Sequence, residues 1–444
     1  MTGIEIGAIS LVVMVGLIYV GMHVAIALSA VSFVGVLLVT GNLHTAVSLL
    51  TLSAKDSISS YSFGVVPLFV LMGIFVSEAN IGRDIFTVAN AVFKRFNGGL
   101  GIATVAANAI FAAITGVSIA SAAIFTKIAV PEMIRYGHTP RFSVGVVAGS
   151  SVLGMLIPPS VLLIVYALVA EVSVAAMFTA GILPGLILAA LFCLLIIVLT
   201  RFFPKFTGVA TQGSDAAGQD ALEFFNGLKL IAPAIALIAI VLGGIYGGVF
   251  TPTEAGGAGA FVAMIIALLK GRLSPQKFWN ILADSGKITA SILFLIISAS
   301  MYSRMLGVAG IPSQLSSLIN GLDASFWVIL SIYVLLMVFL GTILDSTSII
   351  LVLVPLFLPI FNGFDANLIW IGVITVLGTE IGLLTPPLGI ACFVIKESLD
   401  DRSISLRDIF IGATPFALVM FVALLIVIMF PALTLSTGWR QRPD

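Results

Sequence analysis

Two Pro-Pro dipeptides lie inside apolar segments of the sequence, where a helix would otherwise continue. The first is in Gly154–Ser160, and the similar motif Gly382–Leu388 follows 228 positions later. Proline lacks a backbone N–H and its ring blocks the preceding turn, so each pair breaks a helix and frees carbonyl oxygens. In hydrocarbon such a break persists only beside protein, water or an ion. Two cation sites built largely from backbone oxygens are the chemistry that these motifs predict.

A segment rich in glycine, serine and threonine precedes each proline pair at a similar separation. These segments are Thr115–Ser121 and Gly341–Ser348, and we interpret each as the tip of a helical hairpin. The ordered pair of motifs indicates an internal duplication. The first site would be lined by the Ser118–Ser121 and Gly154–Pro159 regions, and the second by the Gly341–Asp345 and Gly382–Pro387 regions. The alternative is that both proline pairs are kinks that relieve helix packing.

The composition limits the classes of protein to which this chain can belong. Of 444 residues, 60% are hydrophobic and only 9% are charged, whereas an average soluble domain has about 25% charged residues. These values predict an all-α polytopic membrane protein and exclude soluble enzymes and nucleic-acid binders. Three histidines and two cysteines are scattered, so no metal-dependent catalysis is expected. The sequence also lacks a Walker A motif and a His-Glu-x-x-His motif.

The uncharged intervals divide the chain into two halves joined by one polar stretch. This stretch, 202–226, is the expected cytoplasmic linker between residues 1–201 and 227–444. A spanning helix needs roughly 20 apolar residues, so 6–54 is expected to hold two spans with a turn near Gly21–His23. The other expected elements are, in the first half, a span at 63–80, a hairpin at about 98–126, a broken helix at about 142–170 and a span at 172–200, and, in the second half, spans at 230–250, 255–269 and 288–305, a hairpin at about 325–360, a broken helix at about 367–395 and a span at 409–433.

Positively charged residues favour the cytoplasmic ends of membrane spans. With the N-terminus outside and each hairpin entering and leaving the bilayer on one side, the expected spans place most Lys and Arg residues in the cytoplasm. The same assignment gives the two halves opposite orientations. Two inverted-topology repeats, each with a re-entrant hairpin and a broken helix, are an architecture of secondary transporters.

Five segments of the chain resemble, in order, the large membrane subunit of tripartite ATP-independent periplasmic (TRAP) transporters. They are Thr115–Ala123, Gly154–Ser160, Phe250–Ala255, Gly341–Asp345 and Gly382–Gly389. The resemblance implies an elevator-type fold in the bacterial inner membrane and sodium-driven uptake of an organic acid, such as a sialic acid or a C4-dicarboxylate. It also implies two partners, a small four-helix membrane subunit and a periplasmic substrate-binding protein.

The resemblance further implies two or more sodium ions, held mostly by backbone carbonyls of the hairpins and broken helices. Val117 replaces a serine that is common in the family, so a side-chain oxygen is missing there. By the resemblance, the first sodium site would use Ser118, Ser121, Gly154, Ile157 and Pro159, and the second would use Gly341, Asp345, Gly382, Thr385 and Pro387.

Ionisable residues inside membrane segments are functional candidates by default. Asp345, aligned with Ser118 of the first half, could bind sodium or cap the returning helix. Arg304 could pair with a substrate carboxylate, or it could snorkel or pair with an aspartate near the outer interface. Structural roles are expected for Glu254 and Glu380. The candidate substrate contacts are Arg304, Ser118 and Ser346.

Taken together, the residues and the resemblance predict a secondary active transporter and no enzyme activity. Cations would offset the cost of placing an anion in a low-dielectric site. A transport domain of hairpins and broken helices would then slide against a scaffold of outer spans. Within the same fold, the alternative is a stand-alone sodium–anion symporter that needs no binding protein. From another class, the alternative is a membrane-embedded enzyme or a channel.

Overall fold

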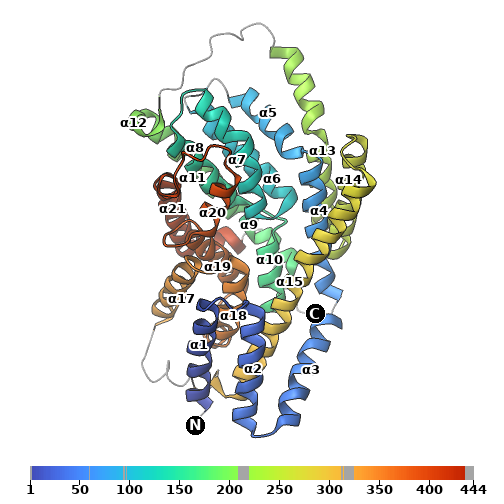
Figure 1. The fold of residues 1–444 in the computed structure, drawn as a ribbon, viewed down its shortest axis with the longest axis vertical. Coiled ribbons are helices and arrows are strands. Elements are labelled where there is room, and N and C mark those ends of the chain that lie inside the picture. Colours follow the sequence, from blue (N-terminus) through green and yellow to red (C-terminus); the bar gives the residue numbers. More distant parts are fainter. Residues whose placement is uncertain are drawn as a thin grey trace.

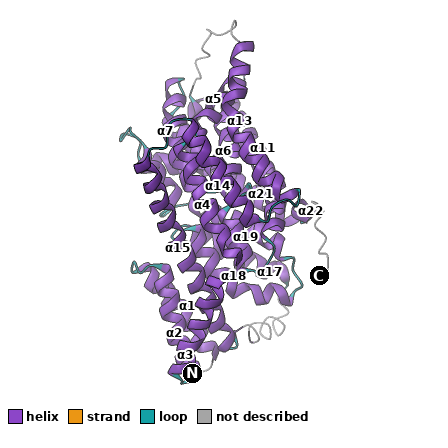
Figure 2. Ribbon diagram, turned by 90° about the vertical axis from the view of Figure 1, so that its right-hand side faces the viewer, coloured by secondary structure: helices purple, strands orange, loops and turns teal. Residues whose placement is uncertain are grey.

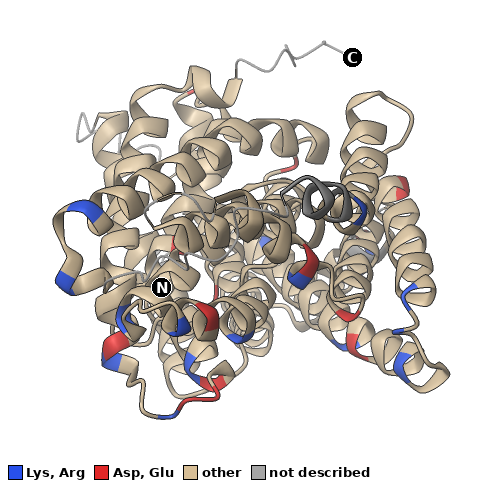
Figure 3. Cartoon of the chain, turned by 90° about the horizontal axis from the view of Figure 1, so that it is seen from above, with Lys and Arg blue, Asp and Glu red and all other residues tan. Residues whose placement is uncertain are grey.

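The computed structural model describes residues 3–59, 61–93, 96, 98–208, 220–311, 314 and 325–435. These residues form helices and no β-strand (Figure 1, Figure 2), which confirms the all-α prediction. Among them, seven helices are long and apolar enough to cross a membrane, or eight if one bent pair counts as a span. Charged residues occupy little of the ribbon (Figure 3). The polytopic membrane prediction is therefore confirmed as well.

The helices follow one another with short connections. In chain order they are α1 Gly3–Tyr19, α2 Val24–Thr40, α3 Leu43–Ser59, the 3₁₀ turn η1 Tyr61–Gly64, α4 Val65–Glu78, α5 Ile81–Phe93, α6 Gly99–Thr115, α7 Ser118–Arg135, α8 Pro140–Ser151, α9 Leu153–Leu156, α10 Val161–Val169, α11 Val174–Phe202, α12 Pro204–Thr207, α13 Asp220–Tyr246, α14 Pro252–Leu269, α15 Pro275–Val308, α17 Phe326–Gly341, α18 Ser346–Gly363, α19 Leu368–Leu383, α20 Ile390–Ser398, α21 Leu406–Met429 and α22 Ala432–Leu435.

One group of helices is built around the long helix α15, which contacts α2, α3 and α4. Figure 1 shows α1, α2 and α3 at the end of the molecule that carries the N-terminus. Helix α14 packs along α4, and α13 packs against α14 and α5. Gly259 permits the close approach of α14, because a Cβ atom there would lie 2.4 Å from the sulfur of Met72. These helices form one packed body.

The second group contains the hairpins and broken helices together with α11 and α21. Helix α21 contacts α8, α11, α19 and α20, and α11 also contacts α6, α9 and α10. Gly181 and Gly185 allow the first helix break to lie close to α11. A Cβ atom at Gly181 would lie 2.6 Å from the carbonyl oxygen of Leu156, and one at Gly185 would lie 2.6 Å from the side chain of Ile157. The spans that follow the two broken helices, α11 and α21, therefore pack with each other and with the broken helices rather than with α1–α4.

The structure corrects the expected division of residues 6–54. Three helices, α1 to α3, occupy this region instead of two, because Gly41 and Asn42 make a second turn. Gly41 ends α2 with φ +64°, and its N–H donates to the carbonyl of Leu37 at 2.8 Å. The side-chain oxygen of Asn42 then accepts from the N–H of His44 at 2.9 Å and starts α3. This turn carries no charge, so the charge-free interval did not reveal it.

Two further boundaries differ from expectation. The linker predicted at 202–226 is shorter, because α12 occupies Pro204–Thr207 and α13 already begins at Asp220; residues 209–219 lie outside the described residues. The span expected at 288–305 is the last part of α15, which begins at Pro275. Its first turns carry Lys277 and Lys287, and these charges concealed the helix from a search for uncharged runs.

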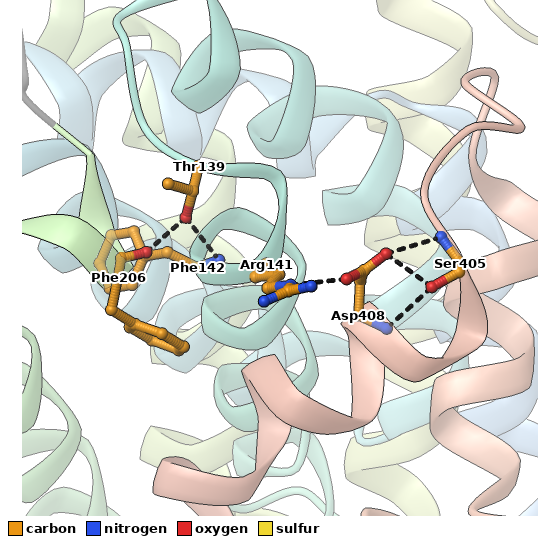
Figure 4. A network of polar contacts seen from close by, with 6 residues as sticks. All are labelled: Thr139, Arg141, Phe142, Phe206, Ser405 and Asp408. Atoms are coloured by element: carbon orange, nitrogen blue, oxygen red, sulfur yellow. Dashed lines mark hydrogen bonds and ion pairs between the residues drawn. The ribbon is translucent and has the colours of Figure 1, made fainter.

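Helices α8 and α21 come from opposite halves, and their backbones touch. A Cβ atom at Gly145 would lie 2.2 Å from the carbonyl oxygen of Gly412, and one at Gly412 would lie 2.1 Å from that of Arg141. At the end of this contact, Arg141 Nε donates to Asp408 Oδ1 at 2.6 Å, and Asp408 forms a capping box with Ser405 (Figure 4). Small residues allow such close packing of membrane helices.

The close contact and the ion pair should contribute very differently to stability. We expect Gly412→Ala to lower the free energy of unfolding by about 1–3 kcal/mol, because the methyl group overpacks the contact. Arg141→Gln should cost less than about 1 kcal/mol, since the arginine side chain is 54% exposed and exposed pairs are weak. Thermal unfolding midpoints in detergent measure both variants. Equal losses of stability in the two variants would show that the backbone contact contributes no more than the ion pair.

Candidate functional site

The first hairpin consists of α6 and α7, joined by the two residues Gly116 and Val117. Gly116 adopts φ +64° and closes α6 through a 3.0 Å hydrogen bond from its N–H to the carbonyl of Ala112. Val117 is extended, so α7 starts at Ser118. The turn positions the N-terminal end of α7, where backbone N–H groups have no partner within the helix.

The first broken helix places its break directly against this tip. Helices α9 and α10 flank the proline pair, and the peptide bond between the prolines is cis. The N–H of Val161 donates to the carbonyl of Gly116 at 3.2 Å. A Cβ atom at Gly116 would lie 2.4 Å from the carbonyl oxygen of Pro159, and one at Gly154 would lie 3.2 Å from the backbone nitrogen of Ser118. The structure thus brings Ser118, Gly154 and Pro159 together.

The other two residues of the first predicted sodium site have different surroundings. The hydroxyl of Ser121 donates to Asn108 Oδ1, and Asn108 Nδ2 donates to Ser150 Oγ at 2.6 Å. This chain of hydrogen bonds joins α7, α6 and α8. Ile157 lies in the break, and its side chain packs against Gly185 of α11. The side chain of Ser121 is therefore engaged in holding the hairpin to the broken helix.

The second hairpin, α17 and α18, presents a longer tip from Thr342 to Asp345. Asp345 caps α18, because its carboxylate accepts from the Ser348 N–H at 3.0 Å and from the Ser348 hydroxyl at 2.5 Å. The capping interpretation of Asp345 is thus confirmed. Its counterpart in the first half is Val117, since both precede the first helical residue. The expected alignment of Asp345 with Ser118 is wrong by one residue, and Ser346 is the true counterpart of Ser118.

The second break, between α19 and α20, contacts the second tip in the same manner as the first. The N–H groups of Leu388 and Gly389 lie 3.2 and 3.3 Å from the carbonyl oxygen of Thr342. The backbones of Gly341 and Gly382 touch, because a Cβ atom at Gly382 would lie 2.4 Å from the Cα atom of Gly341. Both halves therefore bring a hairpin tip against a helix break.

The two breaks differ in exposure and in side-chain bonding. Pro158 and Pro159 are buried, whereas Pro386 and Pro387 are exposed. In the second break, the hydroxyl of Thr385 donates to the carbonyl of Ile381 at 2.7 Å. Because this hydroxyl is already hydrogen-bonded, the backbone carbonyl of Thr385 is its remaining candidate ligand for a cation.

Arg304 lies away from these contacts, in the wall of a cavity of about 750 Å³. Its guanidinium donates to Asp56 Oδ2 at 2.5 Å, as the aspartate-paired interpretation predicts. None of the predicted sodium ligands lines this cavity. Glu254, beside it, forms a capping box with Thr251 at the start of α14, which agrees with a structural role. Of the three candidate substrate contacts, Arg304 is thus separate from Ser118 and Ser346.

Comparison with known protein families identifies the family of this chain. Residues 11–433 match the family described as tripartite ATP-independent periplasmic transporter, DctM component. The chain belongs to this family. It is therefore a multi-pass protein of the bacterial inner membrane, related to transporter permeases.

Relatives of the DctM family cover nearly the whole chain. The C4-dicarboxylate TRAP transporter large permease protein DctM of Pseudomonas aeruginosa is 33% identical over 390 residues, covering 87% of this chain and 88% of the relative. The sialic acid TRAP transporter large permease protein SiaM of Vibrio cholerae is 28% identical over 421 residues, covering 95% of each. The solved YdaH transporter of Alcanivorax borkumensis has a TM-score of 0.62 at 14% identity, with 89% of this chain and 90% of that chain covered; this likeness concerns the fold alone.

Two polar residues of this DctM-family chain were not among the predicted site residues. Asn108 and Ser150 are fully buried and hold Ser121 in place. An asparagine inside an otherwise apolar run is the signal that could have identified the network, because buried amides need hydrogen-bond partners. Glu380, for which only a structural role was expected, is also buried and accepts from the Ser346 hydroxyl at 2.8 Å.

Proposed function

We propose that this DctM-family chain is the large permease of a sodium-coupled system for the uptake of an organic acid. A periplasmic binding protein would deliver the substrate, and a small four-helix membrane subunit would assemble with the chain. Two or more sodium ions would bind at the tip–break contacts. The hairpin body would then move against the body around α15 in an elevator-like step.

The observation that carries this proposal is the repeated contact between a hairpin tip and a helix break. The start of α7 lies beside α9, since a Cβ atom at Gly154 would lie 3.2 Å from the Ser118 nitrogen. The start of α18 lies beside the last turn of α19, where the Ser346 hydroxyl donates to Glu380 at 2.8 Å. Helix C-termini and freed carbonyl oxygens favour cations, and helix N-termini favour anions. One structural unit can therefore hold a sodium ion and an anionic substrate close together.

A carboxylate is the substrate group that this arrangement fits best. Ser118 and Ser346 are the first residues of α7 and α18, where backbone N–H groups without a partner in the helix can donate to an anion. The relatives named for C4-dicarboxylate and sialic acid transport both act on carboxylates. Arg304 lines the cavity of about 750 Å³, and its guanidinium, which Asp56 already pairs, would bind a substrate carboxylate by exchanging that partner.

A vesicle experiment tests the requirement for the two partners. The chain would be reconstituted with its small subunit, and uptake of the ligand that its binding protein retains would be measured with and without that protein. We expect uptake only when all three components are present. Uptake by the chain alone would support the stand-alone symporter instead.

The role of Asp345 can be separated into a cap and a charge. Asn is also a good cap, so Asp345→Asn should keep the unfolding midpoint, while Asp345→Ala should cost about 1 kcal/mol. Both variants should weaken sodium activation of uptake, because both remove the negative charge. Sodium titrations of the uptake rate provide the measurement, and an unchanged titration for Asp345→Asn would remove Asp345 from the second sodium site.

A further inference from the structure

A second cavity, of about 320 Å³, opens where α8 and α21 begin and α11 ends. Its charged lining residues are Arg141 of α8, Lys205 of α12 and Asp408 of α21, and Figure 4 shows the contact between the first and the last of them. None of the predicted sodium ligands or substrate contacts lines this cavity. A water molecule occupies about 30 Å³, so the space accepts a considerably larger group.

Hydrogen bonds hold two walls of the cavity in place. On one side, the N–H of Thr139 donates to the carbonyl of Thr207 at 3.1 Å, and the Thr139 hydroxyl donates to the carbonyl of Phe206. These bonds tie the start of α8 to α12. On the other side, Lys396 Nζ donates to the carbonyl of Ile404 at 2.6 Å and fixes the segment that leads into α21. The cavity is therefore formed before any ligand binds.

The two basic side chains offer more hydrogen-bond donors than the protein uses. Arg141 Nε donates to Asp408 Oδ1 at 2.6 Å, and the terminal nitrogens of Arg141 have no hydrogen bond with the described residues. Lys205 is exposed and belongs to none of the ion pairs among those residues. Two cations thus face one carboxylate. Arginine binds phosphate through paired donors and lysine binds it as a point charge, so the cavity suits an anion.

The surroundings of the cavity indicate the source of the anion. Helix α11 is apolar and long enough to cross a membrane, and Phe202 and Phe203 at its end are 70% and 57% exposed. Aromatic side chains gather at membrane interfaces, and basic residues such as Arg135 and Arg201 favour the cytoplasmic side. Basic pockets between membrane helices on that side bind the headgroups of anionic lipids.

We propose that this cavity binds the phosphate group of an anionic phospholipid in the cytoplasmic leaflet. The terminal nitrogens of Arg141 donate to two phosphate oxygens while Asp408 holds the guanidinium through Nε, and Lys205 contacts a third oxygen. The walls come from α8 and α12 of the first half and α21 of the second half, so the lipid joins the two halves at this end. The inference uses the expected orientation of the chain and is independent of sodium coupling.

Lipid-dependent stabilisation of the purified full-length chain in detergent tests this site. Ligands that bind only the folded state raise the unfolding midpoint by mass action. We expect phosphatidylglycerol to raise the wild-type midpoint more than phosphatidylcholine does. The concentration for half-maximal stabilisation should rise about fivefold in Lys205→Gln and about tenfold in Arg141→Gln, which loses the paired donors. Arg141→Lys keeps the charge without the fork, so its value should fall between wild type and Arg141→Gln.

A matched arginine and a soluble probe complete the test. Arg135 lies at the end of α7, its side chain is 77% exposed, and it does not line the cavity, so Arg135→Gln should leave the phosphatidylglycerol titration unchanged. Inorganic phosphate should stabilise only at far higher concentrations, because it lacks acyl chains. If Arg141→Gln does not fold, Lys205→Gln decides the test.

Three results would overturn the site. The first is a phosphatidylglycerol titration that is the same in wild type, Arg141→Gln and Lys205→Gln. The second is equal stabilisation by phosphatidylcholine. The third is inorganic phosphate acting at the same concentration as phosphatidylglycerol, which would assign the cavity to a soluble anion instead of a lipid.

Discussion

Gly116→Ala is expected to abolish substrate uptake while leaving the chain in the membrane. The added Cβ atom would lie 2.4 Å from the carbonyl oxygen of Pro159, so the first tip and the first break must separate. The left-handed backbone of Gly116 adds a cost of roughly 1–2 kcal/mol for alanine, and overpacking adds about 1–3 kcal/mol. The measurement is the initial uptake rate in vesicles with a sodium gradient, normalised to the amount of inserted protein.

Gly41→Ala is the matched control for this variant. Gly41 has the same φ of +64° and also ends a helix, but no atom lies within 4 Å of its added Cβ. This variant carries the backbone cost alone, so its uptake should stay within about twofold of wild type. If Gly116→Ala transports as well as Gly41→Ala, the contact between tip and break is not part of the transport site.

The second large effect is expected for Gly382→Ala. Its Cβ atom would lie 2.4 Å from Gly341 Cα and 2.7 Å from the carbonyl oxygen of Val338. The neighbouring atoms belong to the backbone, which cannot move aside as a flexible side chain does. Sodium-driven uptake should therefore fall by on the order of 100-fold, the size of effect that a displacement of about 1 Å produces in a binding constellation.

Gly286→Ala provides the comparison for a glycine inside a helix. No atom lies within 4 Å of its added Cβ, and alanine is favoured over glycine in helices by about 1 kcal/mol. Stability should be retained or slightly raised, with normal uptake. A normal uptake rate for Gly382→Ala as well would show that the second contact can open without loss of transport.

Much of the fold follows from the sequence because the bilayer allows few solutions. Uncharged runs indicate membrane helices, and proline pairs within them indicate breaks, since hydrocarbon penalises any unpaired backbone group. The hairpins and broken helices of the structure occupy the expected places, although α7 continues to Arg135 and α8 begins at Pro140. The opposite orientation of the halves and the elevator motion stay predictions.

The pairing of side chains could not be obtained from spacing alone. Glu380 meets Ser118 and Ser346 only because α7, α18 and α19 converge from distant parts of the chain. The partner of Arg304 is Asp56, 248 residues away, and no local pattern connects them. The Gly41–Asn42 turn is also invisible to a charge-based search, because glycine and asparagine shape the chain through backbone conformation rather than charge.

The most direct test of the account is the cation dependence of uptake by the complete system. Vesicles that contain the chain and its small subunit would receive the loaded binding protein under an inward gradient of sodium, lithium or potassium. Sodium alone should drive accumulation, and dissipation of its gradient should stop it. Equal accumulation with lithium or potassium would contradict the claim that the paired tip–break contacts bind sodium and couple it to the substrate.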